Sequence, residues 1–255
     1  MKINNISGGY PGAFTLNNIS FTIEEGKMYA LLGLNGCGKT TLIKMILGIL
    51  KAKSGSIFVE DRDILTTKEK DRARLISYVP QYSNIPFDTS VIDVVLMGIT
   101  PYLKIFETPS NAHIKQAYTC LEEFGIAHLA DLNYQSLSGG QKQMVIIARA
   151  LLQNGRYMIL DEPESSLDLI NKNEFMKKIK QINKTYNKGC IISMHSPEYA
   201  LNYCDHILLL RDGKITEIDI AKEDIQSIER LGLSPIHRRT FTYRITIKGQ
   251  GYGHI

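Results

Sequence analysis

The stretch that decides the fold is an apolar segment running into a glycine-rich loop: Met28-Tyr29-Ala30-Leu31-Leu32-Gly33-Leu34-Asn35-Gly36-Cys37-Gly38-Lys39-Thr40. Its first five residues are nearly all apolar, which is typical of a strand buried on both faces. The loop fits the pattern GxxxxGKS/T, and residues 41–47 after it predict a helix that stops near Gly48. This order of strand, loop and helix predicts a phosphate-binding site.

The chemistry of this loop follows from its residue types. Glycines let the backbone wrap closely, so that successive N–H groups and the helix N-terminus point at phosphate oxygens. We expect Lys39 to reach the β- and γ-phosphates and the Thr40 hydroxyl to coordinate Mg²⁺. Kinases, GTPases and motor ATPases would match the loop equally well. The predicted nucleotide-binding residues are Gly33, Asn35, Gly36, Cys37, Gly38, Lys39, Thr40 and Thr41.

Working outward, the chain alternates between strand-like and helix-like segments. The residues expected to form strands are 14–23, 56–59, 76–79, 158–160, 191–193 and 207–210, with a helix around 171–182. Such alternation predicts an α/β core with a mainly parallel sheet and an antiparallel start. From about residue 84 to 145 the strand signals vanish and the apolar spacing becomes helical, which predicts a helical insert.

An apolar strand ending in two acids, Tyr157-Met158-Ile159-Leu160-Asp161-Glu162, offers a second functional element. Ligands bind at strand ends in open α/β sheets. One carboxylate there can hold Mg²⁺ and its neighbour can polarise an attacking water. We assign Asp161 to the metal and Glu162 to the general base.

Bulk properties exclude several classes of protein. The chain has 255 residues, 44% of them hydrophobic and 22% charged, and a net charge of +4 that gives no indication of nucleic-acid binding. The four cysteines form no CxxC pair, so no zinc site or disulfide framework is expected. We expect no signal peptide, and no apolar run approaches the roughly 20 residues that span a bilayer. A membrane role would therefore require a partner.

The pentapeptide Leu137-Ser138-Gly139-Gly140-Gln141 precedes a predicted helix at 142–151. A serine and two glycines before a helix form an N-cap with exposed N–H groups, hence an anion site. In this order, after the phosphate loop and about 20 residues before the acids, the sequence resembles the ABC ATPase family, whose signature this is. The resemblance implies a P-loop NTPase with a RecA-like, mainly parallel sheet, an N-terminal antiparallel β subdomain and a helical signature subdomain.

The resemblance extends to further residues and implies their roles. Tyr10 matches an aromatic that stacks on adenine, and Gln81 matches a glutamine that senses Mg²⁺ and links the core to the insert. Asp168 closes a loop, 165–168, that crosses the family's dimer interface, and His195 matches a γ-phosphate contact. The implied catalytic residues are Glu162, His195 and Gln81. The implied metal ligands are Thr40, Gln81 and Asp161. The implied nucleotide contacts beyond the phosphate loop are Tyr10, Ser138, Gly139, Gly140, Gln141 and Asp168.

The match covers about residues 1 to 215, and we predict one ABC ATPase domain over 1–255. Glu164 stands where the family usually has threonine, and Leu34 replaces a common proline. The tail, about 222–255, departs more strongly, although 241–247 alternates like a strand.

The family resemblance also implies a mechanism. Two such domains bind head to tail with ATP and Mg²⁺ between them, and the phosphate loop of one copy meets the signature of the other. The implied partners are a second copy, transmembrane permease subunits and, indirectly, a substrate-binding protein, with no nucleic acid. The implied location is the cytoplasmic face of the cell membrane, as a peripheral subunit.

Residues 85–98 and 100–106, with the Asn35–Lys39 variant of the loop, are similar to importers of metal chelates. That group takes up iron–siderophore complexes, haem, cobalamin and oxyanions such as molybdate. An iron chelate is the first expectation for the cargo, and cobalamin or molybdate the second. The alternative is a soluble ABC ATPase of translation, repair or cofactor assembly, although there is one phosphate loop and no sustained heptad pattern. A P-loop kinase or GTPase would leave residues 137–141 unexplained.

Overall fold

A computed structural model describes residues 1–12, 15–83, 85, 88–164 and 169–220, with side chains described from 172 in the last range. The predicted strand at 241–247 and the tail lie outside the described residues. Within them, no helix combines the length and apolar character needed to cross a bilayer.

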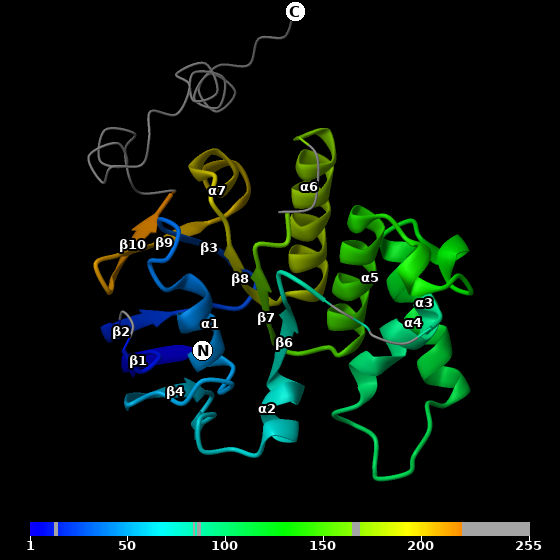
Figure 1. Cartoon of the computed structure of the whole chain (residues 1–255), viewed down its shortest axis with the longest axis horizontal. Helices are drawn as coiled ribbons and strands as arrows, with labels where there is room; N and C mark the ends of the chain where they lie inside the picture. The colour runs from blue at the N-terminus through cyan, green and yellow to red at the C-terminus, as the bar shows by residue number, and fades with distance from the viewer. Residues whose placement is uncertain (13–14, 84, 86–87, 165–168, 221–255) are drawn as a thin grey trace, which may run out of the picture.

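The described strands form two sheets (Figure 1). The smaller sheet is antiparallel, in the order β2-β1-β4-β5. The larger has the order β10-β9-β3-β8-β7-β6, and all its pairs are parallel except β10 with β9. The strands are β1 (Lys2–Gly8), β2 (Leu16–Thr22), β3 (Met28–Leu32), β4 (Ser54–Val59), β5 (Arg62–Asp63), β6 (Ile76–Val79), β7 (Tyr157–Asp161), β8 (Gly189–Ser193), β9 (His206–Arg211) and β10 (Lys214–Asp219).

The helices divide between the core and the stretch that joins β6 to β7. In Figure 1, α3, α4 and α5 stand together at the opposite end of the molecule from β1, β2 and β4. The α-helices are α1 (Lys39–Ile46), α2 (Glu69–Leu75), α3 (Val91–Leu96), α4 (Asn111–Glu123), α5 (Gly139–Leu152), α6 (Leu169–Tyr186) and α7 (Pro197–Tyr203). Short 3-10 turns are η1 (Met97–Ile99), η2 (Ala127–Leu129) and η3 (Tyr134–Ser136). The prediction of an α/β core with an antiparallel start and a helical signature region is confirmed.

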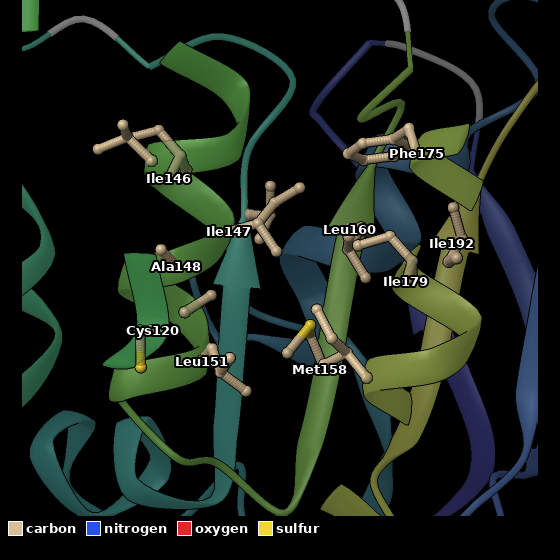
Figure 2. Close-up of a cluster of buried hydrophobic side chains, with 14 of the residues drawn as sticks. Cys120, Ile146, Ile147, Ala148, Leu151, Met158, Leu160, Phe175, Ile179 and Ile192 are labelled. Atoms are coloured by element: carbon tan, nitrogen blue, oxygen red, sulfur yellow. The ribbon is translucent and has the colours of Figure 1, made fainter. Parts of the chain in front are cut away.

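The large sheet is buried on both faces because its strands alternate between two hydrophobic clusters. Tyr157 and Ile159 of β7 belong to the cluster that packs α1 against the small sheet. Met158 and Leu160 belong to the other cluster, which contains residues of α5 and α6. Figure 2 shows this second cluster, with Ile147 and Leu151 of α5 on one side of β7 and Phe175 and Ile179 of α6 on the other. The two packed faces hold β7, and the acids that end it, in a fixed place.

Candidate functional site

Four neighbouring strands end at the same edge of the sheet. β3, β8, β7 and β6 are adjacent and parallel, so their carboxyl ends meet. β3 leads into Gly33, β7 ends in Asp161 and Glu162, β8 leads to His195, and β6 leads to Gln81. Residues spread over more than 160 positions of sequence therefore converge on one site.

The phosphate loop takes backbone conformations that favour glycine. Gly36 has φ 77° and Gly38 φ 103°, in the left-handed region that other residues rarely adopt. A Cβ on Gly33 would lie 2.6 Å from the carbonyl oxygen of Leu210, so the loop also packs closely against β9. Gly38 is the N-cap of α1, and Lys39 begins the helix. The N–H groups of the first turn of α1 thus open onto the loop, as an anion site requires.

Lys39 is 5% exposed and folds back over its own loop. Its Nζ donates to the carbonyl oxygen of Gly33 at 2.9 Å and to that of Leu34 at 3.4 Å. The same Nζ lies 3.9 Å from Oε1 of Glu162. The ammonium group therefore stands between the phosphate loop and the acids of β7.

The side chains of Gln81 and His195 both contact the Glu162 carboxylate, so the three predicted catalytic residues lie together. Gln81 Nε2 donates to Glu162 Oε2 at 2.7 Å, and His195 Nε2 lies 2.7 Å from Glu162 Oε1. The carboxylate is 13% exposed. Its backbone has φ 46°, a conformation that costs a residue with a Cβ free energy and concentrates at functional sites. The structure thus brings Lys39, Glu162, Gln81 and His195 together.

Asp161 is held by a residue that the sequence reasoning did not single out. The Asp161 side chain is 1% exposed, and its Oδ1 accepts a hydrogen bond of 2.6 Å from Ser193 Oγ. The same Oγ accepts from the backbone N–H of Glu162 at 2.8 Å. Ser193 pairs with Asp161 in the β7–β8 register, so one hydroxyl orients both acids. The only signal in the sequence was a polar residue at the end of an apolar strand.

Tyr10 lies beside α1 and is 45% exposed. Its hydroxyl accepts a hydrogen bond of 3.4 Å from Lys44 Nζ, which lies 5.9 Å from the ring centroid. Lys44 is on the helix that begins at Lys39, so the aromatic ring is close to α1, the helix that follows the glycine-rich loop. An exposed ring at this place is free to stack on a base.

The signature residues form a separate element at the start of α5. Ser138 is the N-cap: its Oγ accepts from the N–H of Gln141 at 3.3 Å, and Gln141 Oε1 accepts from the N–H of Ser138 at 3.0 Å. Gly139 and Gly140 lie between them. In the part of the chain described here, no hydrogen bond or ion pair joins these four residues to the phosphate loop. Asp168 lies outside the described residues.

Glu164 has an environment unlike that of Glu162. It is 8% exposed, and its Oε2 has no hydrogen-bond partner among the described residues. Burial raises the pKa of the Glu164 carboxyl, and the nearby Glu162 raises it further, whereas Lys172 and His195 lower it. Burial therefore makes this carboxyl harder to ionise than an exposed glutamate.

The fold and these residues define a class: a P-loop NTPase with a glutamate close to the lysine of the loop. A family model described as ABC transporter matches residues 16–165. The chain therefore belongs to the ABC transporter family, as an ATP-binding subunit with ATPase activity.

Known relatives agree with this assignment. The chain is 38% identical over 216 residues to the "Probable iron chelatin transport ATP-binding protein" of Helicobacter pylori (strain ATCC 700392 / 26695), covering 84% of this chain and 85% of that one. It is 33% identical over 226 residues to the hemin import ATP-binding protein HmuV of Bordetella pertussis, covering 86% and 85%. The dimeric structure of MJ0796, a bacterial ABC transporter cassette, superposes with a TM-score of 0.75 at 26% identity, covering 86% and 98%.

Proposed function

We propose that this chain is the motor subunit of an importer of the metal-chelate group, with an iron chelate as the first choice of cargo and cobalamin or the oxyanion molybdate as the second. It works as a head-to-tail dimer on the cytoplasmic face of a membrane, bound to permease subunits. A substrate-binding protein delivers the cargo to those subunits. The relatives named for iron chelatin and hemin support the cargo class. The dimeric MJ0796 cassette supports the dimer.

The observation that carries the ATPase mechanism is the Glu162 carboxylate. It lies within 4 Å of Lys39 and within hydrogen-bond distance of Gln81 and His195. Glu162 accepts a proton from the attacking water as general base, and its hydrogen bond to Gln81 fixes the direction in which the carboxylate points. Lys39 leaves the loop carbonyls and donates to the β- and γ-phosphates of ATP.

The donor set at this site fits Mg²⁺. The described residues contain no group of three or more His, Cys, Asp or Glu side chains that could hold a metal by themselves. Mg²⁺ needs fewer protein ligands, because it binds one or two carboxylates together with phosphate oxygens and water. The hydroxyl of Thr40, the amide oxygen of Gln81 and the carboxylate of Asp161 would hold it. When bound, the ion would neutralise charge on the β- and γ-phosphates.

Glu162→Gln tests the assignment of the general base. The amide keeps the size of the side chain but cannot accept a proton, so we expect ATP turnover to fall by about 10²- to 10⁴-fold. Glu122→Gln, an exposed change of the same charge on α4, is the matched control and should keep the wild-type rate. Wild-type turnover by the Glu162→Gln chain would remove Glu162 from this role.

The transport proposal is tested by purifying the tagged chain from native membranes in mild detergent. Recovery of a polytopic permease, with a binding protein whose ligand can be analysed, would support the importer and identify its cargo. The alternative is a soluble ABC ATPase of translation, repair or cofactor assembly. Recovery only from the soluble fraction, with ribosomes, DNA or assembly factors, would favour that alternative.

A further inference from the structure

Ser193 is the last residue of β8, the strand that lies between the strand leading to the phosphate loop and the strand ending in the acids. In the register of the sheet it pairs with Leu31 of β3 on one side and with Asp161 of β7 on the other. Ser193 is fully buried. Its hydroxyl therefore needs hydrogen-bond partners within the protein, because an unpaired polar group buried away from water costs free energy.

The hydroxyl of Ser193 has a single proton, and its two side-chain contacts determine the direction of that proton. The oxygen accepts from the backbone N–H of Glu162 at 2.8 Å, and the O–H donates to Asp161 Oδ1 at 2.6 Å. A distance of 2.6 Å is typical of a hydroxyl that donates to a carboxylate. This hydrogen bond engages Oδ1 of Asp161 and leaves the other carboxylate oxygen, Oδ2, outside it.

The two contacts of the hydroxyl differ in how easily they are replaced. The Glu162 N–H also donates to the carbonyl oxygen of Ser193 at 3.2 Å, and a residue of any type at position 193 would keep that acceptor. In a Ser193→Ala chain the backbone of Glu162 therefore keeps a partner, whereas Asp161 loses the hydroxyl donor. The substitution thus isolates the contact between Ser193 and Asp161.

We propose that Ser193 is a positioning residue for the metal: its hydroxyl fixes the rotation of the Asp161 carboxylate and so presents Oδ2 to Mg²⁺. This inference rests on the role of Asp161 as a metal ligand in the proposed function. Without the donor the carboxylate turns more freely, and ordering it on metal binding reduces the metal affinity. Ser193 acts through Asp161 and does not itself touch the nucleotide or the ion.

The experiment measures the Kd of Mn²⁺ for the ADP-loaded chain by electron paramagnetic resonance. Mn²⁺ is the probe because it shares with Mg²⁺ the preference for carboxylate and water oxygens. We expect Ser193→Ala to raise this Kd by about 10- to 100-fold, the usual effect of removing a hydrogen-bond partner of a metal ligand. The Kd of ADP in EDTA, measured by calorimetry, should stay within about twofold, because no metal takes part.

Ser77→Ala is the matched control. Ser77 is also fully buried in the large sheet, on β6, and its Oγ accepts from the N–H of Gly155 at 3.0 Å. Loss of this hydroxyl should lower the stability of the chain but leave the Kd of Mn²⁺ at the wild-type value. Ser193→Thr keeps a hydroxyl on the same carbon atom, and its Kd for Mn²⁺ should stay within about threefold of wild type.

Asp161→Asn separates a failure of this inference from a failure of the proposed function. It should weaken Mn²⁺ binding at least as much as Ser193→Ala does, and adding Ser193→Ala to it should change the Kd little further. A wild-type Kd for Mn²⁺ in Asp161→Asn would overturn the metal role of Asp161, and the inference with it. A raised Kd in Asp161→Asn but not in Ser193→Ala would overturn the role of Ser193 alone.

Two further outcomes would also count against Ser193. An equal rise in the Kd of ADP in EDTA would place the effect of Ser193→Ala on the nucleotide site or the fold rather than on the metal. A Ser193→Thr chain that melts like wild type, yet binds Mn²⁺ as weakly as Ser193→Ala, would show that the hydroxyl is not what the site requires.

Discussion

At the scale of single residues, three acids at the end of β7 meet different surroundings. Asp161 is buried and accepts from Ser193, whereas Glu162 is reached by Gln81 and His195. Glu164 is buried with one oxygen unpartnered. Burying a carboxyl without a full set of donors favours its neutral form. The carboxyl two residues from the predicted general base is thus harder to ionise than an exposed glutamate.

The raised pKa of Glu164 predicts a pH-dependent stability. Above the ordinary value of 4.5 the unfolded chain releases this proton, while the folded chain keeps it until pH reaches the raised pKa. The folded state therefore binds more protons in that window, and its stability falls as pH rises. Glu164→Gln has no proton to lose. We expect the Tm of Glu164→Gln, relative to that of wild type, to increase as the pH rises above 4.5.

Calorimetric or fluorescence melts across that pH range check this expectation. The control is Glu122→Gln, the same replacement at an exposed position of α4. A Tm difference for Glu164→Gln that stays constant from pH 5 to 8 would show that Glu164 titrates alike in both states.

Sequence reasoning at this scale predicted which residues would be near one another. Lys39, Asp161 and Glu162 could be placed because each follows a buried strand at a known offset, and the structure does bring them together with Gln81. Their roles stay predictions. The contact of Ser193 with Asp161 could not be foreseen, because it depends on the register of β7 and β8, and a serine at a strand end is common in solvated loops.

At the scale of elements, local pattern identified the segments that carry strong apolar periodicity and missed the others. β1 (Lys2–Gly8) was not predicted: register shifts interrupt its pairing with both neighbours, and Asn5 has φ 49° within it. α2 (Glu69–Leu75) was also missed, since none of its residues is buried and it has no apolar face. Both are stabilised by neighbours rather than by their own sequence, which single-sequence patterns do not detect.

The packing of η1 on α5 predicts an intolerant glycine. A Cβ on Gly98 would lie 2.3 Å from the Arg149 carbonyl oxygen and 3.1 Å from the Gln153 nitrogen, both backbone atoms of the α5 region. Neither can move without shifting the helix. We expect Gly98→Ala to destabilise the chain by about 1–3 kcal/mol, as overpacking does, and to lower the Tm accordingly.

Denaturant unfolding measures this directly. Met97→Ala, a truncation of an exposed side chain one residue earlier, should stay within about 0.5 kcal/mol of wild type. If Gly98→Ala were as stable as Met97→Ala, the close approach of η1 to α5 would be wrong.

At the scale of the whole molecule, the order of the strands in the large sheet determines which residues converge on the candidate site. Alternation of strands and helices predicted a mainly parallel sheet, but not that β3 would lie beside β8 and β8 beside β7. That order depends on long-range pairing, to which a local pattern does not respond. It matters because it brings the ends of strands from both halves of the chain to the sheet edge where we predict that the nucleotide binds. Binding should therefore stabilise the folded chain as a unit.

Nucleotide binding should raise the Tm of the full chain, because ATP with Mg²⁺ binds the folded state and not the dispersed strand ends of the unfolded chain. At a free concentration 100 times the Kd the gain is about 2.7 kcal/mol, which corresponds to roughly 5–10 °C for a chain of this size. Lys39→Ala should lose most of this shift, since it removes the ammonium between the phosphate loop and Glu162. Lys177→Ala, which replaces an exposed lysine on α6, should keep this shift.

Chelating Mg²⁺ should reduce the shift of the wild type, because the carboxylate of Asp161 would then face the phosphates without a cation between them. A wild-type Tm that ATP and Mg²⁺ leave unchanged would contradict nucleotide binding at this sheet edge, and an undiminished shift in Lys39→Ala would contradict the role of Lys39 alone.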